Sequence, residues 1–252
     1  MSDAQFVAGN PDSDLVAGAR RTLQANRGGR PGCLVYRRRL RRQRLCRRFR
    51  PRKKILNEKL DGTTFPYYCI PGNHEIMRTD MANFRSAFGD TSRVVDQNGT
   101  RFITLDFSTG RLSGDFTQVQ LLRARLDDAA VNLAISGVVV LQHMLINERI
   151  VNKASQLASR LDAEMEQDWL EDFREESGKS VAFVFGHVEV FQASRENGIS
   201  YLINGNSGKT PAGSSFGGFT GGPGWASTRQ RERGKRRMRR GLNPTCNRTS
   251  TR

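Results

Sequence analysis

The sequence predicts an α/β protein in which helices pack against a sheet. Two short apolar runs, 137–141 and 181–185, have the composition of interior strands that are covered on both faces. The segment 153–174 between them is longer and places apolar residues at helical spacing. This alternation of strand, polar loop and helix is typical of α/β architectures, and 252 residues are enough for one large domain or two small ones.

Local signals set the ends of the expected elements. Helices are predicted where apolar residues recur at intervals of three and four, and strands where they form short continuous runs. Asp115 or Thr117 can cap one helix, and Gly89 can end another. In chain order, the expected elements are a helix over 11–26, a strand over 65–70, a turn over 71–75, a helix over 81–88, a strand over 101–106, a helix over 117–126, a strand over 137–141, a helix over 153–174, strands over 181–185 and 199–203, and a Gly- and Ser-rich loop over 205–224.

The long helix over 153–174 is expected to bury its apolar residues and to expose its acidic ones. The expected core side is formed by Leu157, Leu161, Met165, Trp169, Leu170 and Phe173. The expected solvent side is formed by Asp162, Glu164, Glu166 and Asp168. No cofactor is needed to explain either set.

The net charge of +16 is concentrated in two basic blocks. Residues 27–54 hold 14 Lys or Arg and no acid, and residues 228–252 hold 10 Lys or Arg and one acid. This leaves 17 of the 41 basic residues and 24 of the 25 acidic residues elsewhere, a net charge of −7. The chain is therefore an acidic protein that carries two basic segments.

Several classes of protein are excluded by composition. No apolar run approaches the ~18 residues of a membrane span, so we expect no membrane partner. Met1 is followed at once by Ser2 and Asp3, which is unlike a signal peptide, so the chain as written is expected to be cytoplasmic. The four cysteines form no CxxC pair, which argues against a disulfide scaffold and against a thiolate zinc site.

All three histidines follow the predicted carboxyl ends of buried strands. His74 follows FPYYCIPGN, His143 follows GVVVLQ and His187 follows VAFVFG. Ligands bind at the carboxyl ends of strands in open α/β sheets, and imidazole is both a metal ligand and an acid or base near neutral pH. Each residue alone is readily explained as a hydrogen-bonded loop histidine, but the repetition at three strand ends favours a shared site.

The tetrad Gly72-Asn73-His74-Glu75 is the most specific motif. With it, the sequence resembles the calcineurin-like metallophosphoesterases, whose ordered motifs are Asp-x-His, Gly-Asp, Gly-Asn-His-Asp/Glu, a lone His and Gly-His-x-His. Asp3-Ala4-Gln5 stands at the first motif, the tetrad fits the third, His143 fits the lone His, and Gly186-His187-Val188-Glu189 stands at the last. The intervening text is similar to that of actinobacterial members, and the resemblance extends over about residues 1–220.

The resemblance implies a two-sheet α/β sandwich flanked by helices, and hydrolysis of phosphate mono- or diesters at a binuclear centre. Two divalent metal ions (Mn, Fe or Zn) would clamp a phosphoryl group and activate a bridging water for in-line attack. By motif position, Asp3 would bind the first metal, and Asn73, His143 and His187 would bind the second. His74 would act as the acid that meets the leaving oxygen or would steady the transition state.

Three departures from the family pattern predict weak or absent activity. Gln5 stands where a histidine ligand is expected, and Glu189 stands where the last motif has its second histidine, although a carboxylate can still bind a hard metal. The Gly-Asp motif, whose Asp bridges both metals, is absent. Its expected position falls near Arg37–Arg39, where the preceding residues 31–36 still indicate a strand. Guanidinium is a permanent cation without an acceptor and cannot replace the missing ligand.

The two basic blocks admit three interpretations. They are a nucleic-acid-binding arm, a solvated disordered insertion, or out-of-frame translation. We favour the third, because the first block replaces a segment of about the expected length before the pattern resumes near Ile55. Reading the coding DNA in its other frames tests this: an Asn-Gly-Asp near 37–39 would support it. In any case the blocks are expected to bind polyanions without specificity.

We therefore expect a phosphoesterase domain over 1–221, interrupted by the aberrant basic segment 27–54, and a disordered basic tail over 222–252. The expected substrate is a phosphate ester. The alternative is a noncatalytic, polyanion-binding remnant of a phosphoesterase, which uses 27–54 and 228–252. An intact relative of this kind would be secreted if the 5′ portion of its coding sequence encoded an export signal.

Overall fold

The computed structural model describes residues 17, 20, 23–24, 34–37, 56–61, 66–76, 81–146, 159–188 and 190–204. The expected ligands Asp3 and Glu189, most of the block 27–54 and the whole tail 222–252 lie outside these residues. The expected domain boundaries therefore stay predictions. None of the helices in the described part of the chain is long and apolar enough to cross a membrane.

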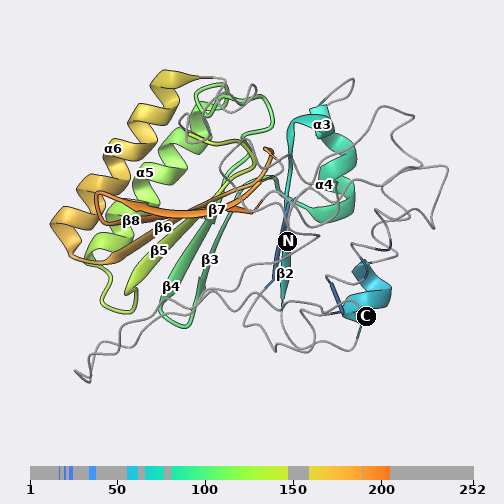
Figure 1. Ribbon diagram of the computed structural model, residues 1–252, viewed down its shortest axis with the longest axis horizontal. Helices are drawn as coiled ribbons and strands as arrows, with labels where there is room; N and C mark the ends of the chain where they lie inside the picture. The colour runs from blue at the N-terminus through green and yellow to red at the C-terminus, as the bar shows by residue number, and fades with distance from the viewer. Residues whose placement is uncertain are drawn as a thin grey trace, which may run out of the picture.

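A six-stranded sheet forms the centre of the molecule (Figure 1). Its strands are β3 (Arg93–Gln97), β4 (Thr100–Thr104), β5 (Gly137–Leu141), β6 (Ser180–Phe185), β7 (Phe191–Glu196) and β8 (Ile199–Asn204), in the order β3-β4-β5-β6-β8-β7. The four inner strands are parallel, and the edge strands β3 and β7 are antiparallel to their neighbours. The inner strands are apolar because both of their faces are covered.

Helices α5 (Phe116–Val131) and α6 (Arg160–Ser177) cover one face of this sheet (Figure 1). Each helix connects two adjacent parallel strands, β4 to β5 and β5 to β6, as the parallel arrangement requires. The carboxylate of Asp115 accepts a hydrogen bond from the Thr117 amide and caps α5. Phe183, Phe185 and Tyr201 lie in the core, and all three are almost completely buried.

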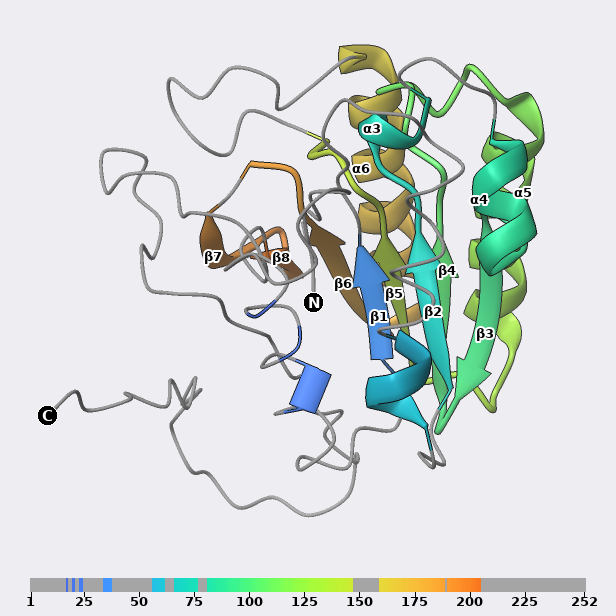
Figure 2. The ribbon, with the colours of Figure 1, turned by 90° about the vertical axis from the view of Figure 1, so that its right-hand side faces the viewer.

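A second, smaller sheet lies on the face opposite α5 and α6 (Figure 2). Strands β1 (Leu34–Arg37) and β2 (Tyr67–Ile70) pair in parallel, and α3 (Asn73–Ile76) and α4 (Ala82–Phe88) lie beyond them. The molecule therefore has two sheets between flanking helices, which confirms the expected α/β sandwich. Strand β1 also confirms that the start of the basic block keeps a strand.

Two strands were not expected from the sequence. Strands β3 and β7 each form a two-residue hairpin with the next strand, through Asn98-Gly99 and Asn197-Gly198. All four turn residues have a positive φ, and Asn-Gly is the preferred pair for such a turn. The two hairpins add the antiparallel edges to an otherwise parallel sheet.

The expected orientation of the long helix is wrong in part. In α6, Asp162 and Glu166 are buried, whereas Leu161 is 78% exposed. Glu164 and Asp168 are exposed, as expected. The buried face is formed by Asp162, Ala163, Glu166, Leu170 and Phe173. Its first two turns are polar because they lie against loops, where Asp162 Oδ2 accepts hydrogen bonds from the backbone N–H groups of Leu112 and Ser113.

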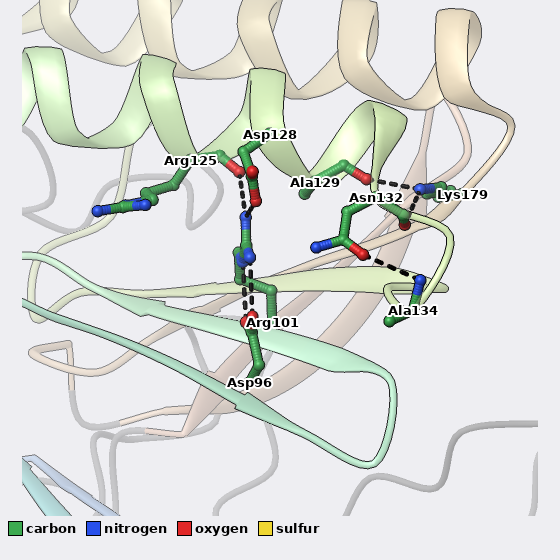
Figure 3. A network of polar contacts seen from close by, with 8 residues as sticks. All are labelled: Asp96, Arg101, Arg125, Asp128, Ala129, Asn132, Ala134 and Lys179. Carbon is green, nitrogen blue, oxygen red and sulfur yellow. Dashed lines mark hydrogen bonds and ion pairs between the residues drawn. The ribbon is translucent and has the colours of Figure 1, made fainter.

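A polar network joins β4 to α5 at the end of the sheet where β4 begins (Figure 3). The guanidinium of Arg101 is only 5% exposed and donates two hydrogen bonds to Asp96, at 2.8 and 2.7 Å. It also donates to Asp128 and to the backbone carbonyl of Arg125. The Nζ of Lys179 donates to two carbonyls at the end of α5. This network fixes the helix to the sheet.

A candidate metal-binding site at the strand ends

Three loops bring polar side chains together at the carboxyl ends of parallel strands. Asn73 follows β2, His143 follows β5 and His187 follows β6. Strands β5 and β6 are neighbours, whereas β2 belongs to the smaller sheet. The site therefore lies where the two sheets meet, and neither sheet alone supplies all three residues.

The loop that carries Asn73 is closed by a buried carboxylate. Glu75 is 2% exposed, and its Oε2 accepts a hydrogen bond of 2.7 Å from the Gly72 amide. The Glu75 amide in turn donates to the Gly72 carbonyl. These reciprocal bonds turn the chain sharply after β2. Asn73 and His74 are the first two residues of α3.

The loop that carries His187 has an uncommon backbone conformation. His187 has φ 72°, and the Val188 amide donates to the Gly186 carbonyl at 2.9 Å. A hydrogen bond across one residue with a positive φ defines a γ-turn of the rarer, strained kind. Outside glycine, such strain costs of order 1–3 kcal/mol and is found most often at functional sites. The turn directs the His187 ring back toward the end of β5.

His143 is fully buried, and its backbone is tied to both neighbours. The amide of Gln142 donates to the Val184 carbonyl, which continues the β5–β6 ladder. The Gly186 amide donates to the His143 carbonyl at 3.1 Å. The two histidine loops are therefore joined directly.

The donor atoms of the three side chains lie close together. His143 Nε2 is 3.2 Å from Asn73 Oδ1 and 3.1 Å from His187 Nδ1. The two imidazole rings are at 74° to one another, with centroids 4.9 Å apart. Ligands bound to one ion at about 2.1 Å lie about 3.0 Å apart at neighbouring octahedral positions and about 3.4 Å apart at tetrahedral ones. Both contacts through His143 Nε2 fit that spacing.

Protons alone satisfy this cluster poorly. Asn73 Oδ1 only accepts hydrogen bonds, and each imidazole nitrogen carries one proton or one lone pair. If His143 Nε2 donates to Asn73, then His187 must share the same proton. If His187 Nδ1 donates instead, then lone pairs of His143 and Asn73 face one another. A cation would engage all three atoms, so the donor set fits a divalent metal that accepts imidazole and carbonyl oxygen.

For the other expected site residues, the described part of the chain gives no side-chain position. Asp3 and Glu189 lie outside them, and the structure describes His74 only as a backbone position on α3 beside Asn73. Within the described residues no group of three or more His, Cys, Asp or Glu side chains is placed to hold a metal. The assembled donors are two imidazoles and one amide, so the ligand assignments stay predictions.

The first residue of the expected bridging position, Arg37, lies at the end of β1. It pairs in register with Ile70, three residues before Asn73. The segment 37–39 therefore begins at the carboxyl end of a strand that adjoins β2. It contains only arginines, so no ligand for a cation comes from it.

The sequence analysis gave no functional role to two buried residues near His143, and it placed one of them, Glu166, on the solvent side. Gln142 and Glu166 are fully buried, and the Gln142 amide donates to Glu166 at 3.1 Å. Burial, opposed by this hydrogen bond and reinforced by Asp162, raises the pKa of Glu166 to about 8. The sequence signal was available, because Gln142 immediately precedes a candidate ligand, but the burial of Glu166 depends on the packing of α6.

Comparison with protein-family models and with curated proteins finds no match. Solved structures with a similar fold are found. One is a dimetal phosphatase from Danio rerio, with a TM-score of 0.56 and 14% identity over 77% of this chain and 79% of that chain. Another is a purple acid phosphatase from yellow lupin (Lupinus luteus) seeds, with a TM-score of 0.52 and 13% identity over 79% of this chain and 41% of that chain.

A third similar structure is described by a different role. It is GAP50, the anchor in the inner membrane complex of Plasmodium, with a TM-score of 0.51 and 11% identity over 83% of this chain and 71% of that chain. These likenesses establish the fold, which is of the metallophosphoesterase type. They leave the activity to be argued from the site.

Proposed function

We propose that this chain is built to hydrolyse phosphate esters with divalent metal ions, and that its own activity is weak. The carrying observation is the convergence of Asn73 Oδ1, His143 Nε2 and His187 Nδ1 at 3.1–3.2 Å, in a fold shared with a dimetal phosphatase. Divalent ions bound there would act as Lewis acids on the phosphoryl group.

The chain's own residues take distinct roles in this proposal. Asn73, His143 and His187 hold one cation. Asp3 and Glu189 are the candidates for a second cation site, which we expect to stay empty in this chain because the bridging carboxylate is missing. His74, next to Asn73 on α3, protonates the leaving oxygen. The relation to actinobacterial metallophosphoesterases, and the loss of their second motif near 37–39, belong to this same proposal.

The test measures metal binding and hydrolysis separately. Isothermal titration with Mn²⁺ is compared between the wild-type chain and the variants His143→Ala, His187→Ala and Asn73→Ala. We expect each variant to lose at least tenfold in affinity, because one of three donors is gone. The matched control is Gln120→Ala, an exposed amide on α5, which should bind as wild type does. Unchanged binding in His143→Ala would overturn the site.

Hydrolysis of p-nitrophenyl phosphate and of its bis ester tests the activity. We expect slow, Mn²⁺-dependent turnover that is lost in His74→Ala, while that variant keeps its Mn²⁺ affinity. Loss of both properties in His74→Ala would assign that residue a ligand role instead. Turnover that is equal with and without metal would contradict the proposed chemistry.

A noncatalytic role is the second candidate, and two observations favour it. The segment 37–39 at the end of β1 offers only permanent cations where a bridging carboxylate is expected. The fold is also shared with a protein described as an anchor. In this case no turnover is expected, and binding to a polyanion such as heparin would fall steeply with salt and survive in His143→Ala.

A further inference from the structure

The backbone around His143 is held by the buried amide of Gln142, which also bonds to a buried carboxyl group on α6. Gln142 Nε2 donates to the backbone carbonyl of Met144 at 3.2 Å and to Glu166 Oε2 at 3.1 Å. The Gln142 side chain thus bridges His143, because it belongs to the residue before His143 and bonds to the carbonyl of the residue after it. All three of Gln142, His143 and Glu166 are completely buried.

Two oxygens of this pair carry no hydrogen bond within the described part of the chain. They are Gln142 Oε1 and Glu166 Oε1, and both are buried. A carboxylate and an amide oxygen are both acceptors, so an ionised Glu166 gives neither a donor. A protonated carboxyl group carries one O–H, so its burial leaves fewer unpaired acceptors than burial of a carboxylate does. Burial already favours that neutral form, since the pKa of Glu166 is raised to about 8.

The neighbouring carboxylate of Asp162 also favours the neutral form of Glu166. Asp162, one turn earlier on α6, is also buried, and its Oδ2 is engaged by the Leu112 and Ser113 amides. A second full negative charge beside it would be unfavourable. The contact of Gln142 with Glu166 is therefore that of an amide with a neutral carboxyl group rather than with a carboxylate.

We propose that Glu166 and Gln142 are positioning residues, which hold His143 in the orientation that brings its Nε2 to Asn73 and His187. The neutral carboxyl group of Glu166 fixes the Gln142 amide, and that amide fixes the backbone on the far side of His143. This inference rests on the proposed metal site for its functional meaning. Outer-shell partners of this kind change metal affinity by about 10- to 100-fold when they are removed.

The test compares Glu166→Gln with Glu166→Leu in the full-length chain. Glu166→Gln keeps a neutral hydrogen-bonding group, and Glu166→Leu fills the space without one. The matched control is Glu164→Leu, an exposed position on the same helix whose carboxylate pairs with Arg160. The first readout is amide hydrogen exchange of residues 141–146 without metal, measured against β4 as an internal reference. The second readout is Mn²⁺ affinity by isothermal titration.

In Glu166→Leu we expect exchange over 141–146 to rise at least tenfold relative to β4, and Mn²⁺ affinity to fall at least tenfold. Glu166→Gln and Glu164→Leu should stay within about twofold of wild type in both readouts. Unchanged exchange in Glu166→Leu would overturn the positioning role. If the wild type binds no Mn²⁺ while the exchange pattern is as expected, then the metal site fails and the positioning role stands.

Discussion

The Arg101 network predicts that removing its two carboxylates lowers the free energy of unfolding more than removing its guanidinium does. Arg101 is 5% exposed, whereas the side chains of Asp96 and Asp128 are 44% and 49% exposed. Removing the cation as Arg101→Met leaves two carboxylates that water can reach. Removing both carboxylates as Asp96→Ala with Asp128→Ala leaves a buried guanidinium whose one remaining partner among the described residues is the Arg125 carbonyl.

The expected losses in the free energy of unfolding follow from this difference in exposure. Arg101→Met loses four hydrogen bonds, but the freed carboxylates regain hydration, so we expect a loss of about 2 kcal/mol. The double variant buries an uncompensated charge, so we expect a loss of about 3–5 kcal/mol. Adding Arg101→Met to the double variant should recover part of that loss, because the stranded charge is then removed.

Urea unfolding followed by circular dichroism measures the four free energies of unfolding. If Arg101→Met proves more costly than the double alanine variant, or if the triple variant is the least stable, then the reasoning is wrong. The pH dependence gives an independent check. The hydrogen bond from Arg101 lowers the pKa of Asp96, so its contribution to stability is present above the unfolded pKa and is lost as pH falls. The gap between wild type and Arg101→Met should therefore narrow below about pH 4.

Four further variants test the packing and the titration of the core by the same unfolding assay. Gly137→Ala should cost about 2–3 kcal/mol, since its Cβ would lie 2.9 Å from the Ser180 carbonyl oxygen. Gly178→Ala, with φ +64° and open space around it, should cost only about 1 kcal/mol. Equal losses would contradict the steric argument. Phe183→Ala should cost about 3–5 kcal/mol because the ring is completely buried, and a loss under 1 kcal/mol would show that the core is loosely packed there. Between pH 5 and 7 the folded chain keeps the Glu166 proton that the unfolded chain releases. As pH rises through this range, the free energy of unfolding of the wild type should therefore fall by about 1 kcal/mol per pH unit relative to that of Glu166→Gln. A difference that does not change with pH would mean that Glu166 is ionised in the folded chain.

The parallel core of the fold was predictable because its strands are continuous apolar runs. Strand β5 (Gly137–Leu141) matches its predicted range, and β6 and β8 differ from theirs by one residue at one end. Strands β3 and β7 were missed because their burial is low and their composition is mixed. Their signal was the Asn-Gly pair at 98–99 and again at 197–198, which marks a hairpin more reliably than the strands themselves do.

The meeting of His143 and His187 was also predictable, since polar residues at the ends of neighbouring parallel strands share one edge of a sheet. Asn73 joins them from the smaller sheet. The surroundings of His143 were not predictable. Asp162 is buried because backbone amides 49 and 50 residues away point at its carboxylate. Glu166 is buried against the end of β5, where its carboxyl group accepts a hydrogen bond from the Gln142 amide. Helical periodicity gives no information about such distant partners, so both acids were assigned to the solvent side.

The number of metal ions bound decides between a complete and a damaged centre. In the proposed site, Asn73, His143 and His187 provide the donors for one cation. The resemblance implies that a second cation needs a shared carboxylate near the end of β1. The sequence at 37–39 is all arginine, and a positive charge at that position would repel a cation. We therefore expect one Mn²⁺ per wild-type chain by equilibrium dialysis with metal analysis. Among the variants Arg37→Asp, Arg38→Asp and Arg39→Asp, we expect one to bind two, because it removes the repulsion and supplies the ligand. Two ions per wild-type chain would show that the arginine segment does not occupy the bridging position.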